Sequence, residues 1–131
     1  MFIFILLFGS YYRDCIIDNI EFDNKVMVVG AGSSNMPEDL VNEGYTDVVV
    51  NDISRVAMKM QQVRLKHLSE NITYQTGNMT DMDMPDGTID AIIDKALLDS
   101  LYCSAMGDTV VAQYIQEVMR LLCNTGCFII I

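Results

Sequence analysis

The chain of 131 residues has the length of one domain, and its composition, 51% hydrophobic with only two prolines, excludes a disordered polypeptide. A chain of this size buries about two thirds of the surface that its unfolded form exposes, which is enough for one hydrophobic core. The formal net charge of −10 disfavours binding to nucleic acid through phosphate neutralisation. We therefore expect one domain over residues 1–131, without a nucleic-acid partner.

The chain starts with eight apolar residues, MFIFILLF. This run is too short to cross a bilayer, which takes about 20 residues, and it lacks the basic start of a signal peptide. It predicts a buried strand or helix that packs on the body of the protein, without stable membrane insertion. The four cysteines lack the spacing of a zinc site, so we expect reduced thiols, no metal centre and a cytoplasmic location.

Apolar runs and amphipathic segments alternate along the rest of the chain. Continuous apolar runs are typical of strands covered on both faces, whereas apolar spacings of three and four residues and capping residues indicate helices. The predicted helices span 10–21, 36–44, 54–70 and 107–123, and the predicted strands span 25–30, 47–52, 72–77, 89–94 and 127–131. This order predicts a Rossmann-like, doubly wound α/β fold with a mostly parallel five-stranded sheet and helices on both faces.

Parallel sheets of this kind bind ligands beyond the carboxyl ends of their strands. Gly30 and Gly32 follow the strand over 25–30, where glycine permits a sharp turn and lets a ligand approach the backbone. Position 35 is asparagine, so the G-x-G-x-x-G pattern of dinucleotide-binding folds is incomplete. On this pattern alone, a tight turn without a ligand remains the alternative.

Asp52 ends the next strand, 20 residues after Gly32. A carboxylate in this position can accept hydrogen bonds from both hydroxyls of a ribose, while the alternative is an acid near the helix cap at Ser54. The pattern thus predicts a ligand that carries a ribose and does not need a pyrophosphate, and S-adenosylmethionine fits this description. Its amino-acid end would then lie over the glycine turn.

Three further residues follow the later strands. Asn78 can hydrogen-bond the edge of an adenine, and Met79 can lie on its face, although core packing explains Met79 equally well. Asp94 can hold the α-ammonium of S-adenosylmethionine or approach a substrate amine. The alternative for Asp94 is a solvated ion pair with Lys95.

The segments VVGAGSS, EGYTDVVVNDIS and the DK…LD stretch together resemble the class I, seven-strand S-adenosylmethionine methyltransferases. More narrowly, residues 8–131 are similar to the eukaryotic methyltransferase-like group that modifies lysines, and in one member the N-terminus, of translation elongation factor one-alpha. The resemblance implies S-adenosyl-L-methionine as cofactor and Asp94 as a catalytic residue. It implies a cofactor site formed by Gly30, Ala31, Gly32, Ser34, Asp52, Ile53, Asn78, Met79 and Asp94.

The chain departs from that family in three places. MFIFILL replaces an aromatic-rich segment with a Tyr-Trp pair, and Ala96-Leu97 replace a Gly-Thr pair after the DK dipeptide. The family's sixth and seventh strands, which form a hairpin, have no counterpart, so we expect a partial methyltransferase domain. The strand over 127–131 would then be an apolar sheet edge, which predicts either a homodimer through this edge or its coverage by MFIFILLF.

These observations predict an S-adenosylmethionine-dependent methyltransferase of protein lysine or N-terminal amines, with a translation factor as a possible protein substrate. The first alternative is a cofactor-binding module without catalytic activity that acts as a regulatory or interaction protein. A nicotinamide-dependent oxidoreductase or another nucleotide-binding protein is the second alternative. Asn35 argues against it, as does the absence of a Tyr-x-x-x-Lys motif.

Overall fold

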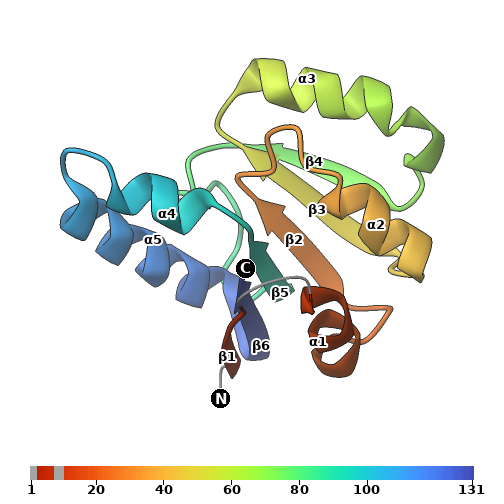
Figure 1. The fold of residues 1–131 in the computed structure, drawn as a ribbon, viewed down its shortest axis with the longest axis horizontal. Helices are drawn as coiled ribbons and strands as arrows, with labels where there is room; N and C mark the ends of the chain where they lie inside the picture. Colours follow the sequence, from red (N-terminus) through yellow and green to blue (C-terminus); the bar gives the residue numbers. More distant parts are fainter. Residues whose placement is uncertain (1–2, 8–10) are drawn as a thin grey trace.

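The computed structural model describes residues 3–7 and 11–131, which form a parallel sheet between two layers of helices (Figure 1). Within these residues the sheet has six strands in the order β1-β6-β5-β2-β3-β4, and every neighbouring pair is parallel. The strands are β1 (Ile3–Leu6), β2 (Lys25–Val29), β3 (Asp47–Asp52), β4 (Ile72–Thr76), β5 (Ile89–Asp94) and β6 (Leu122–Ile130). The helices are α1 (Tyr12–Asn19), α2 (Met36–Glu43), α3 (Arg55–Arg64), η1 (Lys66–Leu68), α4 (Leu97–Tyr102) and α5 (Gly107–Leu121).

The apolar runs of the sequence become the central strands because both of their faces are covered. Successive side chains of a strand point to opposite faces, so Val26 and Val28 pack in one core cluster and Met27 and Val29 pack in the other. The first cluster also holds buried residues of α1, α2 and α3, whereas the second holds those of α5. Figure 1 shows the same division, with α1–α3 on one side of the sheet and α4 and α5 on the other. The predicted doubly wound α/β fold is therefore confirmed.

The predicted number of strands was one too few. The described part of the apolar N-terminal run forms β1, which pairs with β6 from Ile3 opposite Cys127 to Leu6 opposite Ile130. Phe4 packs edge-on against Phe128 of β6, with ring centroids 4.9 Å apart. The N-terminal run thus covers the β6 edge, but the expectation of a buried segment was wrong for β1, because Ile3, Phe4 and Leu6 are 41, 58 and 57% exposed. In this structure β1 occupies the outer edge of β6, and a homodimer of the chain stays a prediction.

Two helices differ from the prediction. The helix expected over 54–70 is divided into α3 and the short η1, and α4 follows β5 where no helix was predicted. The segment of α4 is only six residues long, which is too short for a helical repeat to stand out in the sequence. The expected start of the first helix at residue 10 lies outside the described residues, and α1 begins at Tyr12.

The strand order reverses between β2 and β5. From β2 the chain builds β3 and β4 on one side, then crosses to build β5 and β6 on the other. In open α/β sheets, the crevice at such a reversal, beyond the carboxyl ends of the strands, is where ligands bind. No helix in the described part of the chain is long and apolar enough to span a membrane.

Candidate functional site

A cleft of about 450 Å³ lies at the carboxyl ends of β2, β3, β4 and β5. Its volume is within the range of about 300–1,000 Å³ that is usual for small-molecule sites. The residues that line it follow the four strands or lie on α4 and α5. They are Gly30, Asn51, Asp52, Ile53, Gly77, Asn78, Met79, Thr80, Ala96, Leu97, Ser100, Leu101, Val110 and Gln113. The cleft is therefore at the strand reversal, where the topology places a ligand.

The glycine turn and Asp52 meet at this cleft. The backbone N–H of Gly32 donates a hydrogen bond to Oδ2 of Asp52 over 2.7 Å, and the N–H of Ser54 donates to Oδ1 over 2.8 Å. Both glycines have a positive φ, 57° at Gly30 and 49° at Gly32, which other residues rarely adopt. An added Cβ at Gly30 would lie 2.9 Å from Cβ of Leu97, so this glycine also lets α4 approach the turn.

The hydrogen bonds of the turn distinguish between types of ligand. The N–H groups of Ala31, Gly32 and Ser34 donate to acceptors within the protein: the carbonyl oxygen of Asn51, the Asp52 carboxylate and the carbonyl oxygen of Ala31. A pyrophosphate site depends on free N–H groups at such a turn. An ionised carboxylate has about four lone-pair sites, so after its two bonds Asp52 keeps acceptor capacity on both oxygens. The site thus fits the hydroxyls of a ribose better than it fits a pyrophosphate.

Two buried amides that were not predicted from the sequence hold the turn in place. Asn51 donates to the carbonyl oxygens of Gln75 and Gly77, which ties the end of β3 to the exit of β4. Gln61 of α3 donates through Nε2 to the carbonyl oxygens of Gly32 and Ser34 over 2.9 and 3.0 Å. Each amide is 1% exposed. The sequence places Gln61 among apolar residues with helical spacing. Many polar residues of a helix have such neighbours, so this pattern does not indicate a buried residue that positions the turn.

The exit of β4 supplies a second wall of the cleft. Asn78 is exposed there, as is Ile53 at the end of β3, whereas Met79 is 3% exposed and belongs to a core cluster as well as to the cleft. Oδ1 of Asn78 accepts hydrogen bonds from the N–H and the hydroxyl of Thr80. The wall therefore presents an amide beside an apolar surface, as an adenine requires.

Asp94 ends β5 as predicted, but its carboxylate faces the protein. It accepts hydrogen bonds from the N–H groups of Ala96, Leu97 and Leu98 at the start of α4 and from the hydroxyl of Tyr114, 2.7 Å away. The side chain is 0% exposed, and burial raises the pKa of this carboxyl. In this structure Asp94 positions α4 and its first turn, and no ion pair with Lys95 is found among the described residues. A direct contact of Asp94 with cofactor or substrate stays a prediction.

The predicted site residues thus fall into two groups. Gly30, Asp52, Ile53, Asn78 and Met79 line the cleft, whereas Ala31, Gly32, Ser34 and Asp94 do not line it. The contributions of α4 and α5 were missed, because α4 was not predicted and nothing in the sequence indicates which face of α5 meets the cleft. Within the described chain, no cluster of His, Cys, Asp or Glu could hold a metal ion.

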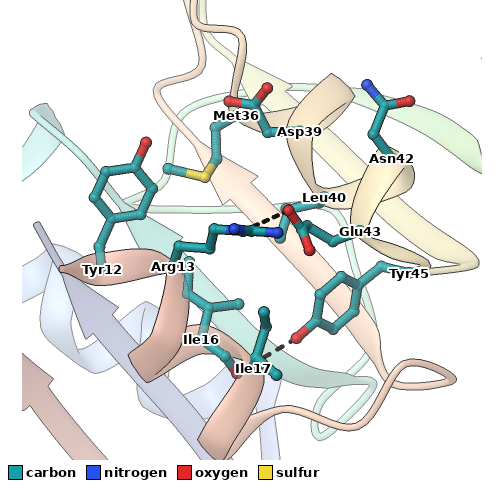
Figure 2. A pocket seen from close by; sticks show the side chains of 10 residues that line it. All are labelled: Tyr12, Arg13, Ile16, Ile17, Met36, Asp39, Leu40, Asn42, Glu43 and Tyr45. Carbon is teal, nitrogen blue, oxygen red and sulfur yellow. Dashed lines mark hydrogen bonds and ion pairs between the residues drawn. The ribbon is translucent and has the colours of Figure 1, made fainter. Parts of the chain in front are cut away.

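A second cavity, of about 230 Å³, lies between α1 and α2 (Figure 2). Figure 2 shows Arg13 of α1 directed toward Glu43 of α2, with which it forms an ion pair of 2.5 Å. The hydroxyl of Tyr45 donates to the carbonyl oxygens of Ile16 in α1 and of Ile20 at the C-terminal end of α1. This cavity is smaller than usual ligand sites, and its charged side chains at 13 and 43 neutralise each other. The cleft at the strand ends is the better candidate.

Fold and cleft together define the class of this protein: a Rossmann-like α/β domain with a ligand site at the carboxyl ends of its parallel strands. A family model described as "Methyltransferase domain" matches residues 27–130. The chain therefore belongs to the methyltransferase domain family. The predicted similarity to class I S-adenosylmethionine methyltransferases is confirmed.

Among curated relatives, the eEF1A lysine and N-terminal methyltransferase of Bos taurus is 31% identical over 121 residues, 91% of this chain and 17% of the relative. The EEF1A lysine methyltransferase 4 of Mus musculus is 30% identical over 115 residues, 82% of this chain and 45% of the relative. The chain thus spans less than half the length of either relative.

Solved structures agree on the fold. A putative S-adenosyl-L-methionine-dependent methyltransferase from Methanococcus maripaludis matches with a TM-score of 0.75 and 17% identity over 89% of this chain and 52% of the other. Phosphoethanolamine N-methyltransferase 1 of Haemonchus contortus, solved with phosphoethanolamine and S-adenosylhomocysteine, matches with a TM-score of 0.67 and 25% identity. This match covers 85% of this chain and 23% of the other.

Proposed function

We propose that this chain binds S-adenosyl-L-methionine in the cleft at the strand ends and transfers its methyl group to an amine of a protein. The observation that carries the proposal is the hydrogen bond between the glycine turn and Asp52, which leaves carboxylate acceptor sites at the mouth of the cleft. Membership in the methyltransferase domain family supports the same activity.

Each part of the cleft has a proposed role. Asp52 accepts hydrogen bonds from the ribose hydroxyls, and Asn78 and Met79 hold the adenine by its edge and face. The glycine turn at Gly30 leaves room for the amino-acid end of the cofactor. Asp94 acts as a positioning residue, because it holds the first turn of α4 against Gly30 through its bonds to backbone N–H groups.

When bound, S-adenosylmethionine supplies a methyl group on a positively charged sulfur that a nucleophile can attack. The contribution of the chain is to align the acceptor with that methyl group and to exclude water. The apolar wall formed by Leu97, Leu101 and Val110 disfavours a charged amine next to it, which promotes the neutral, nucleophilic form of a lysine.

The acceptor that we propose is a lysine or the N-terminus of a translation factor, on the basis of the relatives that carry this activity in their names. The chain's acidic character is compatible with a basic protein substrate. A cytoplasmic location, where translation factors work, is part of the same proposal. The alternative of an inactive cofactor-binding module has no support from the comparisons.

Titration with S-adenosylhomocysteine by calorimetry tests the cofactor site. Asp52→Ala removes the ribose acceptor, and we expect binding to weaken by about a hundredfold, as for the loss of charge-assisted hydrogen bonds. Asp47→Ala, at the opposite end of β3, is the matched control and should bind as the unchanged protein does. Equal affinity of the Asp52→Ala variant and the unchanged protein would refute the ribose assignment.

Transfer of a labelled methyl group to purified eEF1A, followed by mass spectrometry of its lysines and N-terminus, tests the reaction. Label on one of these amines is the expected result. Tight binding of S-adenosylhomocysteine without transfer to eEF1A or to proteins of a cell extract would favour the inactive module instead.

A further inference from the structure

Positive charge in this acidic protein is concentrated on α3 and on η1, which follows it. Arg55, Lys59, Arg64 and Lys66 are four of the eight Lys and Arg residues, and residues 54–69 contain no acid. The rest of the chain contains the other four basic residues and all 18 acids, so it carries a formal charge of −14. The segment of α3 and η1 is therefore a positive pole on a negative molecule.

The same helix exposes a row of large apolar side chains. Val56, Met60 and Val63 are 69, 64 and 79% exposed, and their spacing of four and three residues places them on one face of α3. The opposite face carries Met58 and Gln61, which are buried against the body of the protein. Single exposed apolar residues are common, but a row along one helix face indicates a surface with a partner. We call Val56, Met60 and Val63 the α3 stripe.

A groove of about 570 Å³ adjoins the α3 stripe, between Met60 and Val63 on one side and the turn at Gly32 and Ser33 on the other. None of its lining residues also lines the cofactor cleft. In Figure 1, α3 lies on the outer side of the molecule, away from α4 and α5. The groove gives the stripe a recess in which a side chain of a partner can insert.

Basic side chains run along the edge of the α3 stripe. At 100° per residue, Arg55 and Lys59 lie on the flank next to Val56 and Val63, and both are exposed. Arg55, Lys59 and Lys66 form no ion pair within the described residues, whereas Arg64 pairs with Glu38 at 2.8 Å. The flank is thus a row of unneutralised positive charge beside an apolar row.

We propose that the α3 stripe and its groove dock an acidic, amphipathic helical segment of a partner protein, distinct from the methyl acceptor. Apolar side chains of that segment contact Val56, Met60 and Val63, and its carboxylates pair with Arg55 and Lys59. Charge complementarity selects this partner, because opposite charges beside an apolar contact fix orientation and exclude basic segments. An anionic membrane fits less well, because the −14 charge of the rest of the chain repels it.

Fluorescence anisotropy with two labelled synthetic helices tests the proposal. Both carry leucines with helical spacing; one has glutamates and the other has lysines on the flanking positions. We expect the acidic helix alone to bind, and Val56→Ser/Val63→Ser to weaken its binding by about tenfold or more. Met119→Ser, which removes an exposed apolar side chain from α5, is the control and should leave binding unchanged.

Exchange of the charges on α3 provides a more specific test. In Arg55→Glu/Lys59→Glu, binding of the acidic helix should be lost and binding of the basic helix should appear, whereas Lys25→Glu should bind as the unchanged protein does. Binding of S-adenosylhomocysteine should be equal in all these variants, which shows that they are folded. Equal binding of both helices, stripe-dependent binding to phosphatidylserine vesicles in place of the helix, or self-association that Val56→Ser/Val63→Ser abolishes would each overturn the proposal.

Discussion

At the scale of single residues, the site depends on polar groups whose hydrogen bonds are directed inward. The Asp52 carboxylate and the Gln61 amide both bond to the backbone of the turn at Gly32, from β3 and α3 respectively. The two glycines of this turn have positive φ and carry no side chains that could hold its shape. Hydrogen bonds with Asp52 and Gln61, 20 and 29 residues away, therefore help to set its geometry.

Replacement of Gln61 with alanine should weaken cofactor binding without removing any group that touches the cofactor. The carbonyl oxygen of Gly32 loses its donor, whereas that of Ser34 keeps a hydrogen bond from Arg64. A buried polar group without a partner costs about 1–3 kcal/mol. We expect Gln61→Ala to lower the free energy of unfolding in urea by that amount and to weaken S-adenosylhomocysteine binding by about tenfold. Gln62→Ala, one residue further along α3 and exposed, is the control; wild-type binding by Gln61→Ala would contradict the positioning role.

At the scale of elements, α5 holds the irregular segment between β4 and β5. Arg120 donates hydrogen bonds to the carbonyl oxygens of Met82 and Met84 and to the carboxylate of Asp86, and Glu117 accepts from the N–H of Met82. Glu117 and Arg120 also pair with each other at 2.6 Å. A loop of this length would otherwise be mobile, so this pair fixes the wall that carries Met79.

The ion pair of Glu117 with Arg120 predicts a dependence of stability on pH. The hydrogen bonds that Arg120 donates to Glu117 lower the pKa of the Glu117 carboxyl below its usual 4.5, so the folded state favours the ionised carboxylate. Its contribution is therefore fully present above about pH 4.5 and is lost as the pH falls through the lowered pKa. Urea unfolding should show Glu117→Gln to be less stable than the unchanged protein at about pH 7, with a smaller difference at about pH 3. A difference that grows on acidification would contradict this assignment.

At the scale of the whole molecule, one sheet joins both helix layers, and charge is distributed unevenly over the surface. The six described strands form one continuous sheet from β1 to β4, so the two core clusters are separated by the sheet and share it. A net charge of −10 on 131 residues produces self-repulsion in the compact state, which unfolding relieves. The stability of this fold should thus respond to ionic strength.

An increase of sodium chloride from about 0.01 M to about 0.1 M shortens the Debye length from about 30 Å to about 10 Å. Because repulsion among the acids is then screened, we expect the melting temperature to rise by a few degrees. Potassium chloride should give the same shift, since screening does not depend on the cation. A fall in the melting temperature would mean that attractive pairs such as Arg120 with Asp86 outweigh the repulsion.

The strands β2–β6, the helices α1, α2, α3 and α5, and the meeting of the glycine turn with Asp52 at one site were predictable from the sequence. The helix α4 was not predicted, and β6 begins at Leu122 and not at the expected residue 127. A continuous apolar run, a glycine pair and an acid at a strand end are local patterns, and the order of elements fixes which strand ends meet. The family was predictable for the same reason, because its motifs lie at these strand ends.

Tertiary structure alone decided the rest. The apolar sequence of residues 3–6 is compatible with a strand or a helix. These residues form the strand β1 because they pair with the edge of β6. Asp94 ends its strand as expected, yet the direction of its carboxylate depends on α4 and on Tyr114, which are packed against it from a later part of the chain. Burial of a strand on two faces produces a recognisable apolar run in the sequence, whereas hydrogen-bond partners that are remote in the sequence leave no such pattern. The sequence therefore determined the sheet and the place of the site, and packing determined which polar groups face the ligand.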